Sequence, residues 1–402
     1  MKSDTRSGCL FLPGEMTRFL VDAARDKTPI AGWTHNFYRY PARFSPQFAG
    51  QVIELFSKPG ELVLDPFMGG GTAVVEALAA GRRIVGNDLN SLAAFIAKVK
   101  TTPLRASEVC DVKRWALETV PQLSYRFPCD FLAQYLVDQK LKNMNLPSAR
   151  FIKKVIAASL VTIDELQTSR ARYFARCALL RVAQTALDGR KSATSVDAFR
   201  RQLTQTTLAM LNQLEDFCAQ VKLVHAGLTE SCWITNVDAS KLEHLALFAE
   251  QKVSLVVTSP PYPGVHVLYH RWQIKGRRET PAPYWIANTN DGQGGSYYNL
   301  GDRRERTADK YFANLLEALS SIRRVMAPDA FMVQMLAFND PDLQLPRYLA
   351  SMKTAGFMEV LPDEIVCKHK RIWRDVPNRK WHATIKGRTS SSREVVLIHR
   401  VI

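Results

Sequence analysis

Paired cysteines are missing from this sequence of 402 residues. The seven cysteines are odd in number, scattered along the chain, and never spaced as CxxC. Disulfide-dependent secreted proteins and structural zinc sites use cysteines in regular pairs. The pattern argues against both, and it predicts a reducing compartment, which we take to be the cytoplasm. His266 and His270 have a metal-like spacing, but no acid or cysteine stands beside them, so we expect no metal site.

Long apolar runs are missing as well. A membrane-spanning helix needs about 20 apolar residues, and no uncharged run of about 18 occurs anywhere in the chain. The first 16 residues contain no apolar segment long enough for a secretory signal. We therefore expect a protein that neither crosses a membrane nor is exported.

Acidic residues are few relative to basic ones. The chain has 38 Asp and Glu against 54 Lys and Arg, which gives a net charge of +16. Such an excess usually indicates a polyanionic partner, with nucleic acid the first candidate and an acidic membrane surface the second. The hydrophobic fraction of 46% is that of an ordinary globular protein, and the length suffices for two or three compact domains.

The most distinctive stretch that is present reads VSLVVTSPPY, residues 253–262. It begins as an apolar, β-branched run typical of a buried parallel strand, and it ends at two prolines that make a stiff, extended tip. A hydroxyl, rigid carbonyls and an aromatic ring at the end of a strand can hold a flat base. The ring stacks on the base, while the oxygens accept hydrogen bonds from its exocyclic amine. The alternative is a tight strand-to-loop turn with a buried tyrosine.

A second stretch, residues 61–90, predicts a strand, a glycine-rich turn, a helix and a second strand that ends at an acid. The predicted strands are residues 62–64 and 83–86, the turn reads DPFMGGGT, and the acid is Asp88. Glycines let a ligand approach the backbone, and an acid after the second strand can bind ribose hydroxyls. The turn lacks the Lys-Ser/Thr of a P-loop and the GxGxxG of dinucleotide folds. The spacing favours a nucleoside-binding unit.

Together these two stretches resemble the DNA amino-methyltransferases that use S-adenosylmethionine. That family carries a DPFxGxGT-like cofactor loop and a [DNS]PP[YFW] catalytic tetrapeptide, where this chain has DPFMGGGT and TSPPY. The segment YPARFSP, residues 40–46, resembles the family's additional cofactor-binding element. The resemblance covers roughly residues 31–100 and 230–400.

The resemblance implies an α/β fold of the class I methyltransferase type, with a doubly wound, mostly parallel sheet and a large helical insertion. It also implies S-adenosylmethionine as the cofactor, bound at the carboxyl ends of the strands. For Asp238, at the end of the strand predicted within residues 231–242, helix capping is the alternative to contact with the adenine. The implied cofactor-binding residues are Tyr40, Arg43, Asp65, Pro66, Phe67, Gly69, Gly71, Thr72, Asp88 and Asp238.

The implied substrate is double-stranded DNA, whose target base must leave the helix to reach the tetrapeptide. The implied catalytic residues are Ser259, Pro260, Pro261 and Tyr262. The serine form is typical of enzymes that methylate N4 of cytosine, whereas N6 of adenine is the alternative. An RNA amino-methyltransferase and a non-catalytic DNA-binding subunit are further alternatives. A restriction enzyme or another defence component is a candidate partner, and the oligomeric state is left open.

Between the two motifs the sequence predicts helices. Residues 103–230 hold many apolar residues at helical spacing, so we expect a helical insertion between two parts of the core, residues 1–102 and 231–402. The basic residues of the insertion form either a solvated face or a DNA-contacting surface.

Residues 263–306 predict a long loop rich in aromatic and basic residues, and residues 368–388 form a second basic segment. Long loops without their own structure are usually functional or disordered, and arginines beside aromatics suit phosphates and bases. After the loop we expect a return to the α/β core, closed by an antiparallel strand at 394–400. The predicted DNA-binding residues are Arg271, Lys275, Arg277, Arg278, Arg371, Arg374 and Arg379.

Overall fold

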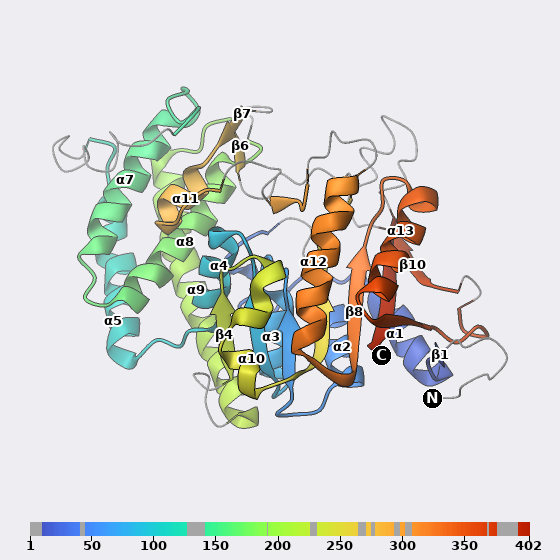
Figure 1. Cartoon of the computed structure of the whole chain (residues 1–402). Coiled ribbons are helices and arrows are strands. Elements are labelled where there is room, and N and C mark those ends of the chain that lie inside the picture. Colours follow the sequence, from blue (N-terminus) through green and yellow to red (C-terminus); the bar gives the residue numbers. More distant parts are fainter. Residues whose placement is uncertain are drawn as a thin grey trace.

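A computed structural model of the chain (Figure 1) describes residues 10–40, 45–126, 141–190, 192–225, 231–263, 271–274, 278–292, 298–301, 308–367, 370–375 and 393–402. Among these residues a nine-stranded sheet has the order β1-β9-β11-β8-β5-β2-β3-β4, with β10 paired to β11. Its strands are β1 (Leu10–Phe11), β2 (Leu62–Asp65), β3 (Arg83–Asn87), β4 (Cys232–Thr235), β5 (Val253–Thr258), β8 (Met326–Leu336), β9 (Phe357–Leu361), β10 (Ile372–Asp375) and β11 (Arg393–Val401).

The winding of the sheet reverses at its centre. From β2 the chain continues to β3 and β4 on one side, and it then returns to place β5 and β8 on the other, all in parallel. The carboxyl ends of β2 and β5 therefore meet at the switch point, where open α/β sheets bind ligands. β11 runs antiparallel between β8 and β9. This order, with one reversed strand, is that of class I methyltransferases, which confirms the predicted fold class.

Alternate side chains of the strands enter two hydrophobic cores, one on each face of the sheet. In β2, for example, Val63 belongs to one core and Leu64 to the other. The first core is covered by α1 (Gly14–Arg25), α2 (Pro46–Phe56), α3 (Thr72–Ala79) and α4 (Ser91–Thr101). The second is covered by the 3-10 helix η4 (Ala239–His244), α10 (Leu247–Glu250), α12 (Asp309–Val325) and α13 (Pro341–Thr354).

Helices fill the described part of the chain between α4 and β4, and they lie beyond the β4 edge of the sheet (Figure 1). They are α5 (Ala106–Arg114), η2 (Trp115–Thr119), η3 (Val120–Gln122), α7 (Arg150–Asp164), α8 (Ser169–Leu187) and α9 (Val196–Val224). α9 packs on α3, α8 packs on α4, and the helices share the first core. No helix of the described residues is long and apolar enough to cross a membrane.

The segment predicted as a long loop contains regular structure. β6 (Trp272–Ile274) and β7 (Arg278–Thr280) form an antiparallel hairpin, and α11 (Ala282–Ala287) follows it. Both β6 and α11 contact α8. The expectation of a structureless loop is wrong for these residues because their aromatic side chains are core residues. Trp272 is 1% exposed, and its indole nitrogen donates to the Tyr38 hydroxyl at 2.9 Å.

Candidate active site

The glycine loop joins the end of β2 to the start of α3. Gly69 has φ +48° and Gly71 has φ +72°, conformations that side chains rarely adopt. A Cβ on Gly69 would lie 3.2 Å from the Tyr40 ring, and a Cβ on Gly71 would lie 3.1 Å from the Cβ of Ala97. The loop is therefore packed so closely that only glycine fits at these two positions. Tyr40, a predicted cofactor residue, lies directly against the loop.

Asp88 follows β3 and binds this loop. One carboxyl oxygen accepts from the Gly69 amide at 2.8 Å, and the other accepts from the Asn90 amide at 2.8 Å. Burial raises the pKa of the Asp88 carboxyl to about 6. A carboxylate has about four acceptor positions, so two remain for hydroxyl groups of a ligand. The predicted ribose acid thus also holds the loop in shape.

Asp65, the last residue of β2, connects the two sequence motifs. Its carboxyl oxygen accepts from the hydroxyl of Thr258, the last residue of β5, at 2.7 Å, and from the Phe67 amide at 3.2 Å. The side chain is 1% exposed, and burial raises its pKa to about 7. The glycine loop and the TSPPY tip are therefore neighbours at the switch point of the sheet.

Asn87, which was not predicted, links the ends of three strands. Its amide nitrogen donates to the carbonyls of Pro66, at 3.2 Å, and Val237, at 3.1 Å. Asp238 caps η4 by accepting from the Ser240 amide at 2.9 Å, so its capping alternative is observed. Thr72 is buried as the first residue of α3. The remaining predicted cofactor residue, Arg43, lies outside the described residues.

Lys100 is a second residue that the sequence did not indicate. It lies in the last turn of α4, it is 1% exposed, and its ammonium donates to the Gly70 carbonyl at 2.5 Å. A buried lysine is rare because removing the charge from water is costly. Its hydrogen bond links the glycine loop to α4.

The tetrapeptide Ser259-Pro260-Pro261-Tyr262, predicted to be catalytic, begins directly after β5. The Ser259 hydroxyl lies 3.0 Å from the Met335 carbonyl and 3.1 Å from the Tyr262 hydroxyl. Tyr262 is 7% exposed, and its hydroxyl donates to Glu394 at 2.8 Å. The Pro261 carbonyl accepts from the Tyr311 hydroxyl at 2.7 Å, whereas Pro260 is buried.

The protein partners of the Ser259 hydroxyl determine which hydrogen bonds it can make to a ligand. A carboxylate only accepts, so the single Tyr262 proton goes to Glu394 when that group is ionised. The Ser259 proton then goes either to the Met335 carbonyl or to the Tyr262 oxygen. In both arrangements the serine oxygen retains a lone pair for an incoming N–H group. The tip is thus built as an acceptor.

The described arginines of the DNA-binding prediction are mostly paired with acids. Arg271 binds Asp291 at 2.8 Å, and Arg371 binds Glu359 at 2.7 Å. Arg374 binds Glu394 at 2.7 Å. Arg278 is exposed at the start of β7. Lys275, Arg277 and Arg379 lie outside the described residues.

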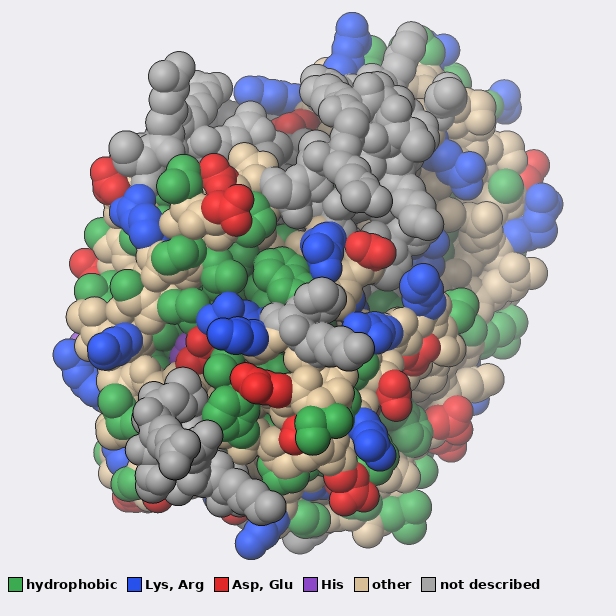
Figure 2. Space-filling view, turned by 90° about the vertical axis from the view of Figure 1, so that its right-hand side faces the viewer, with side chains coloured by type: hydrophobic (Ala, Val, Ile, Leu, Met, Phe, Trp, Pro, Cys, Tyr) green, Lys and Arg blue, Asp and Glu red, His purple; other side chains and the backbone are tan. Residues whose placement is uncertain are grey.

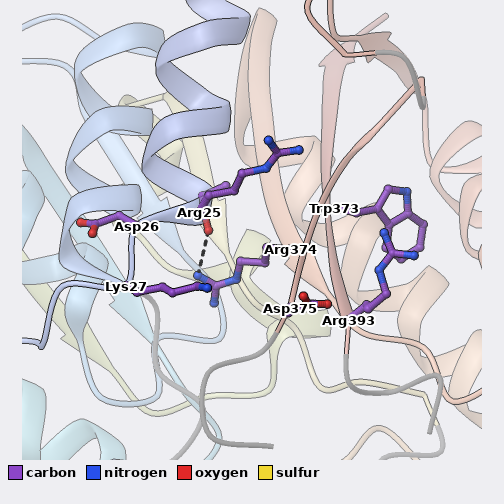
Figure 3. Close-up of a pocket in the computed structure, with 8 residues that line it drawn as sticks. Arg25, Asp26, Lys27, Trp373, Arg374, Asp375 and Arg393 are labelled. Atoms are coloured by element: carbon purple, nitrogen blue, oxygen red, sulfur yellow. Dashed lines mark hydrogen bonds between the residues drawn. The ribbon is translucent and has the colours of Figure 1, made fainter. Parts of the chain in front are cut away.

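On the face that carries β1 and α1, the described lysines and arginines are interspersed with acidic and apolar side chains (Figure 2). A cavity of about 320 Å³ lies between the end of α1 and the strands β10 and β11. The Lys27 and Arg374 side chains extend toward each other from its two sides, whereas the Asp26 carboxylate points away (Figure 3). Its lining residues are Ala24, Arg25, Asp26, Lys27, Trp373, Arg374, Asp375 and Arg393. No group of described His, Cys or acidic side chains is placed to hold a metal ion.

Comparison with known proteins gives matches to part of the chain. The N6/N4 methyltransferase family model, described as DNA methylase, matches residues 23–98. The type II methyltransferase M.MvaI of Kocuria varians is 44% identical over 79 residues, which cover 19% of this chain and 17% of that protein. The type II methyltransferase M.MjaII of Methanocaldococcus jannaschii is 32% identical over 66 residues, 16% of this chain and 12% of that protein.

Among solved structures, the rRNA methyltransferase aviRa of Streptomyces viridochromogenes overlays on 92% of this chain and 90% of its own, with a TM-score of 0.35 and 11% identity. That score is low, and the fold assignment rests on the strand order. The cofactor that the family and fold imply is S-adenosylmethionine. The acceptor positions of Asp88 that the loop amides leave unused fit the ribose hydroxyls of this cofactor. Residues 23–98, which hold the glycine loop and Asp88, are thus similar to DNA amino-methyltransferases, and the matched segment spans less than a fifth of each type II relative's length.

Proposed function

We propose that the protein is a DNA methyltransferase that transfers the methyl group of S-adenosylmethionine to the exocyclic amine of a base, with N4 of cytosine as the preferred target. The observation that carries the proposal is the hydrogen bond of 2.7 Å between Asp65 and Thr258. It holds the cofactor loop and the TSPPY tip side by side. Transfer between two bound groups requires such closeness and alignment.

Ser259 and the Pro260 carbonyl are the proposed acceptors for the amine. Their hydrogen bonds draw the nitrogen lone pair out of conjugation with the ring, and the amine becomes a better nucleophile. S-adenosylmethionine supplies the electrophilic methyl group when bound. The proton contacts of Ser259 support this role, because its proton is directed to Met335 or Tyr262 and its lone pair is left for the base.

Tyr262 is the proposed stacking platform. A ring can hold a base only when it is itself fixed, and the bonds of its hydroxyl to Ser259 and Glu394 supply that restraint. Stacking of a base on an aromatic ring contributes about 1–3 kcal/mol. The base of duplex DNA must first be extruded from the helix to reach this ring.

The choice of cytosine over adenine rests on the serine of the tetrapeptide and on the resemblance. Both bases present an amine beside a ring acceptor, so one hydroxyl does not by itself exclude either. The matched relatives are named type II methyltransferases, which supports DNA as the substrate and a restriction enzyme as a companion. Methylation of RNA and a non-catalytic DNA-binding role are the competing functions.

The test is mass spectrometry of digested DNA after incubation with the protein and S-adenosylmethionine, together with long-read mapping in cells that express the chain. We expect N4-methylcytosine at one recognition sequence. N6-methyladenine would overturn the choice of base, and methylated RNA with unmodified DNA would overturn the substrate. If calorimetry detects no binding of S-adenosylmethionine, the protein is a non-catalytic subunit.

A matched pair of serine variants tests the site. Ser259→Ala should lower the methyl-transfer rate while cofactor affinity stays within about twofold. Ser351→Ala is the control, since that hydroxyl donates to Arg347 on the surface of α13 and lies outside the site. Equal rates for both variants would contradict the proposed role of Ser259.

A further inference from the structure

Glu394 is a buried acid on β11 that contacts the catalytic tetrapeptide. It is 4% exposed, and it accepts from the Tyr262 hydroxyl through Oε1 at 2.8 Å. Directly across the β10–β11 ladder stands Arg374, whose side chain is 9% exposed. The two residues form an ion pair that the resemblance did not lead us to expect.

The geometry of this pair differs from that of a neighbouring pair in the same sheet. Arg371 reaches Glu359 with two nitrogens on two different oxygens, at 2.7 and 2.8 Å. Arg374 instead places Nε and Nη2 on the same oxygen of Glu394, Oε2, at 2.8 and 2.7 Å. The second oxygen is thereby left for Tyr262. Arg271 binds Asp291 in the same one-oxygen form, so what distinguishes Glu394 is the partner of its second oxygen, Tyr262 of the tetrapeptide.

We propose that Glu394, oriented by Arg374, is a positioning residue for methyl transfer, an inference that rests on the proposed function. Glu394 accepts the hydrogen bond of the Tyr262 hydroxyl, and the tyrosine oxygen can then only accept from Ser259. The carboxylate in this way sets the position of the stacking ring and keeps the Tyr262 hydroxyl from donating to the Ser259 oxygen, whose lone pair stays available to the base. It touches neither base nor cofactor.

Arg374 also contacts the end of α1. Its Nη1 donates to the Ala24 carbonyl at 3.4 Å, near the end of α1, and the same guanidinium lines the cavity between α1 and β10 (Figure 3). The helix terminus, Arg374, Glu394 and Tyr262 therefore form one chain of contacts from the surface to the tetrapeptide. This inference gives Arg374 an internal role in place of the predicted contact with DNA.

The test uses glutamine, which keeps the shape of glutamate but has one acceptor oxygen. In Glu394→Gln, Arg374 and Tyr262 compete for that oxygen, so we expect turnover at saturating DNA and cofactor to fall at least tenfold. The KM for DNA and the Kd for S-adenosylmethionine should stay within about twofold. Glu359→Gln weakens the Arg371 pair in the same way without touching Tyr262, and its turnover should equal that of the wild type.

Tyr262→Phe removes only the hydroxyl, and it keeps the inference testable if Glu394→Gln folds poorly. It should lower turnover to a similar extent, and the double variant should be no slower than the slower single variant. Independent, multiplying effects would overturn the inference, as would unchanged turnover in Glu394→Gln. Equal loss of turnover in Glu359→Gln would reduce Glu394 to a stabilising residue. A wild-type protein that methylates no DNA would overturn the proposed function itself, and this inference with it.

Discussion

Replacing Gly71 with alanine should weaken both the fold and the binding of the cofactor. Gly71 precedes α3 at φ +72°, and the added Cβ would lie 3.1 Å from the Cβ and 3.5 Å from the Cα of Ala97 on α4. Because one of the two neighbours is a backbone atom, the obstruction cannot be relieved by a change of rotamer. The loop must move away from α4.

Gly60→Ala is the matched control for backbone strain. Gly60 has φ +82°, and nothing lies within 4 Å of its added Cβ. A left-handed conformation costs a non-glycine residue about 1–2 kcal/mol, of which about 0.4–1 is offset by the stiffer unfolded chain. We therefore expect Gly60→Ala to lose about 1 kcal/mol. Crowding of a packed site adds about 1–3 kcal/mol, so Gly71→Ala should lose about 2–4 kcal/mol.

The two losses can be read from thermal unfolding and calorimetry. An unfolding entropy of about 2.1 cal/mol/K per residue gives about 0.8 kcal/mol/K for 402 residues. Tm should then fall by about 1 °C in Gly60→Ala and by about 2–5 °C in Gly71→Ala. Affinity for S-adenosylmethionine should fall at least tenfold, about 1.4 kcal/mol, only in Gly71→Ala. A folded Gly71→Ala protein with wild-type affinity would refute the assignment of the loop.

Three further predictions concern charge. Burial raises the pKa of Asp65 to about 7 from an ordinary 3.8, so the folded state holds a proton that the unfolded state has released, and stability should fall as pH rises through this window. Thermal unfolding of Asp65→Asn should depend less on pH between about 4 and 7, and an unchanged pH profile would contradict the burial argument. Asp88→Ala should weaken cofactor binding by about 1–3 kcal/mol in calorimetry; a loss of a few tenths would move the ribose contact elsewhere. DNA affinity should fall steeply with salt in filter binding, since the net charge is +16, whereas a flat response would mean that the basic residues do not face phosphates.

Local patterns allowed much of the fold to be predicted. The strand expected at 62–64 is β2, the strand expected at 83–86 is β3, and the closing strand expected at 394–400 is β11. Each is a short apolar run bounded by glycine, proline or polar residues, so its limits depend on neighbours in the sequence. The glycine loop follows the same logic, because its positive φ angles require glycine wherever the chain turns so tightly.

The parts that could not be predicted depend on contacts between distant elements. Lys100 reads as one more basic residue on an amphipathic helix, and its burial follows only from the packing of α4 beneath the loop. Glu394 is paired through the register of β10 and β11, which no local pattern specifies. The aromatics of residues 271–287 suit either DNA or a core. They are buried because the hairpin and α11 pack on α8. The hairpin strands are too short for their sequence to show an alternation of apolar and polar residues.

The bond between Asp65 and Thr258 has a consequence for how the molecule is made. It joins residues 193 positions apart, with the whole helical block between them. Contacts of such long range form late, because the entropy of closing the intervening chain is lost before the contact contributes. In a chain still bound to the ribosome, the Asp65 carboxyl would lack the Thr258 hydroxyl until β5 emerged. The site is therefore complete only after β5 has paired with β2.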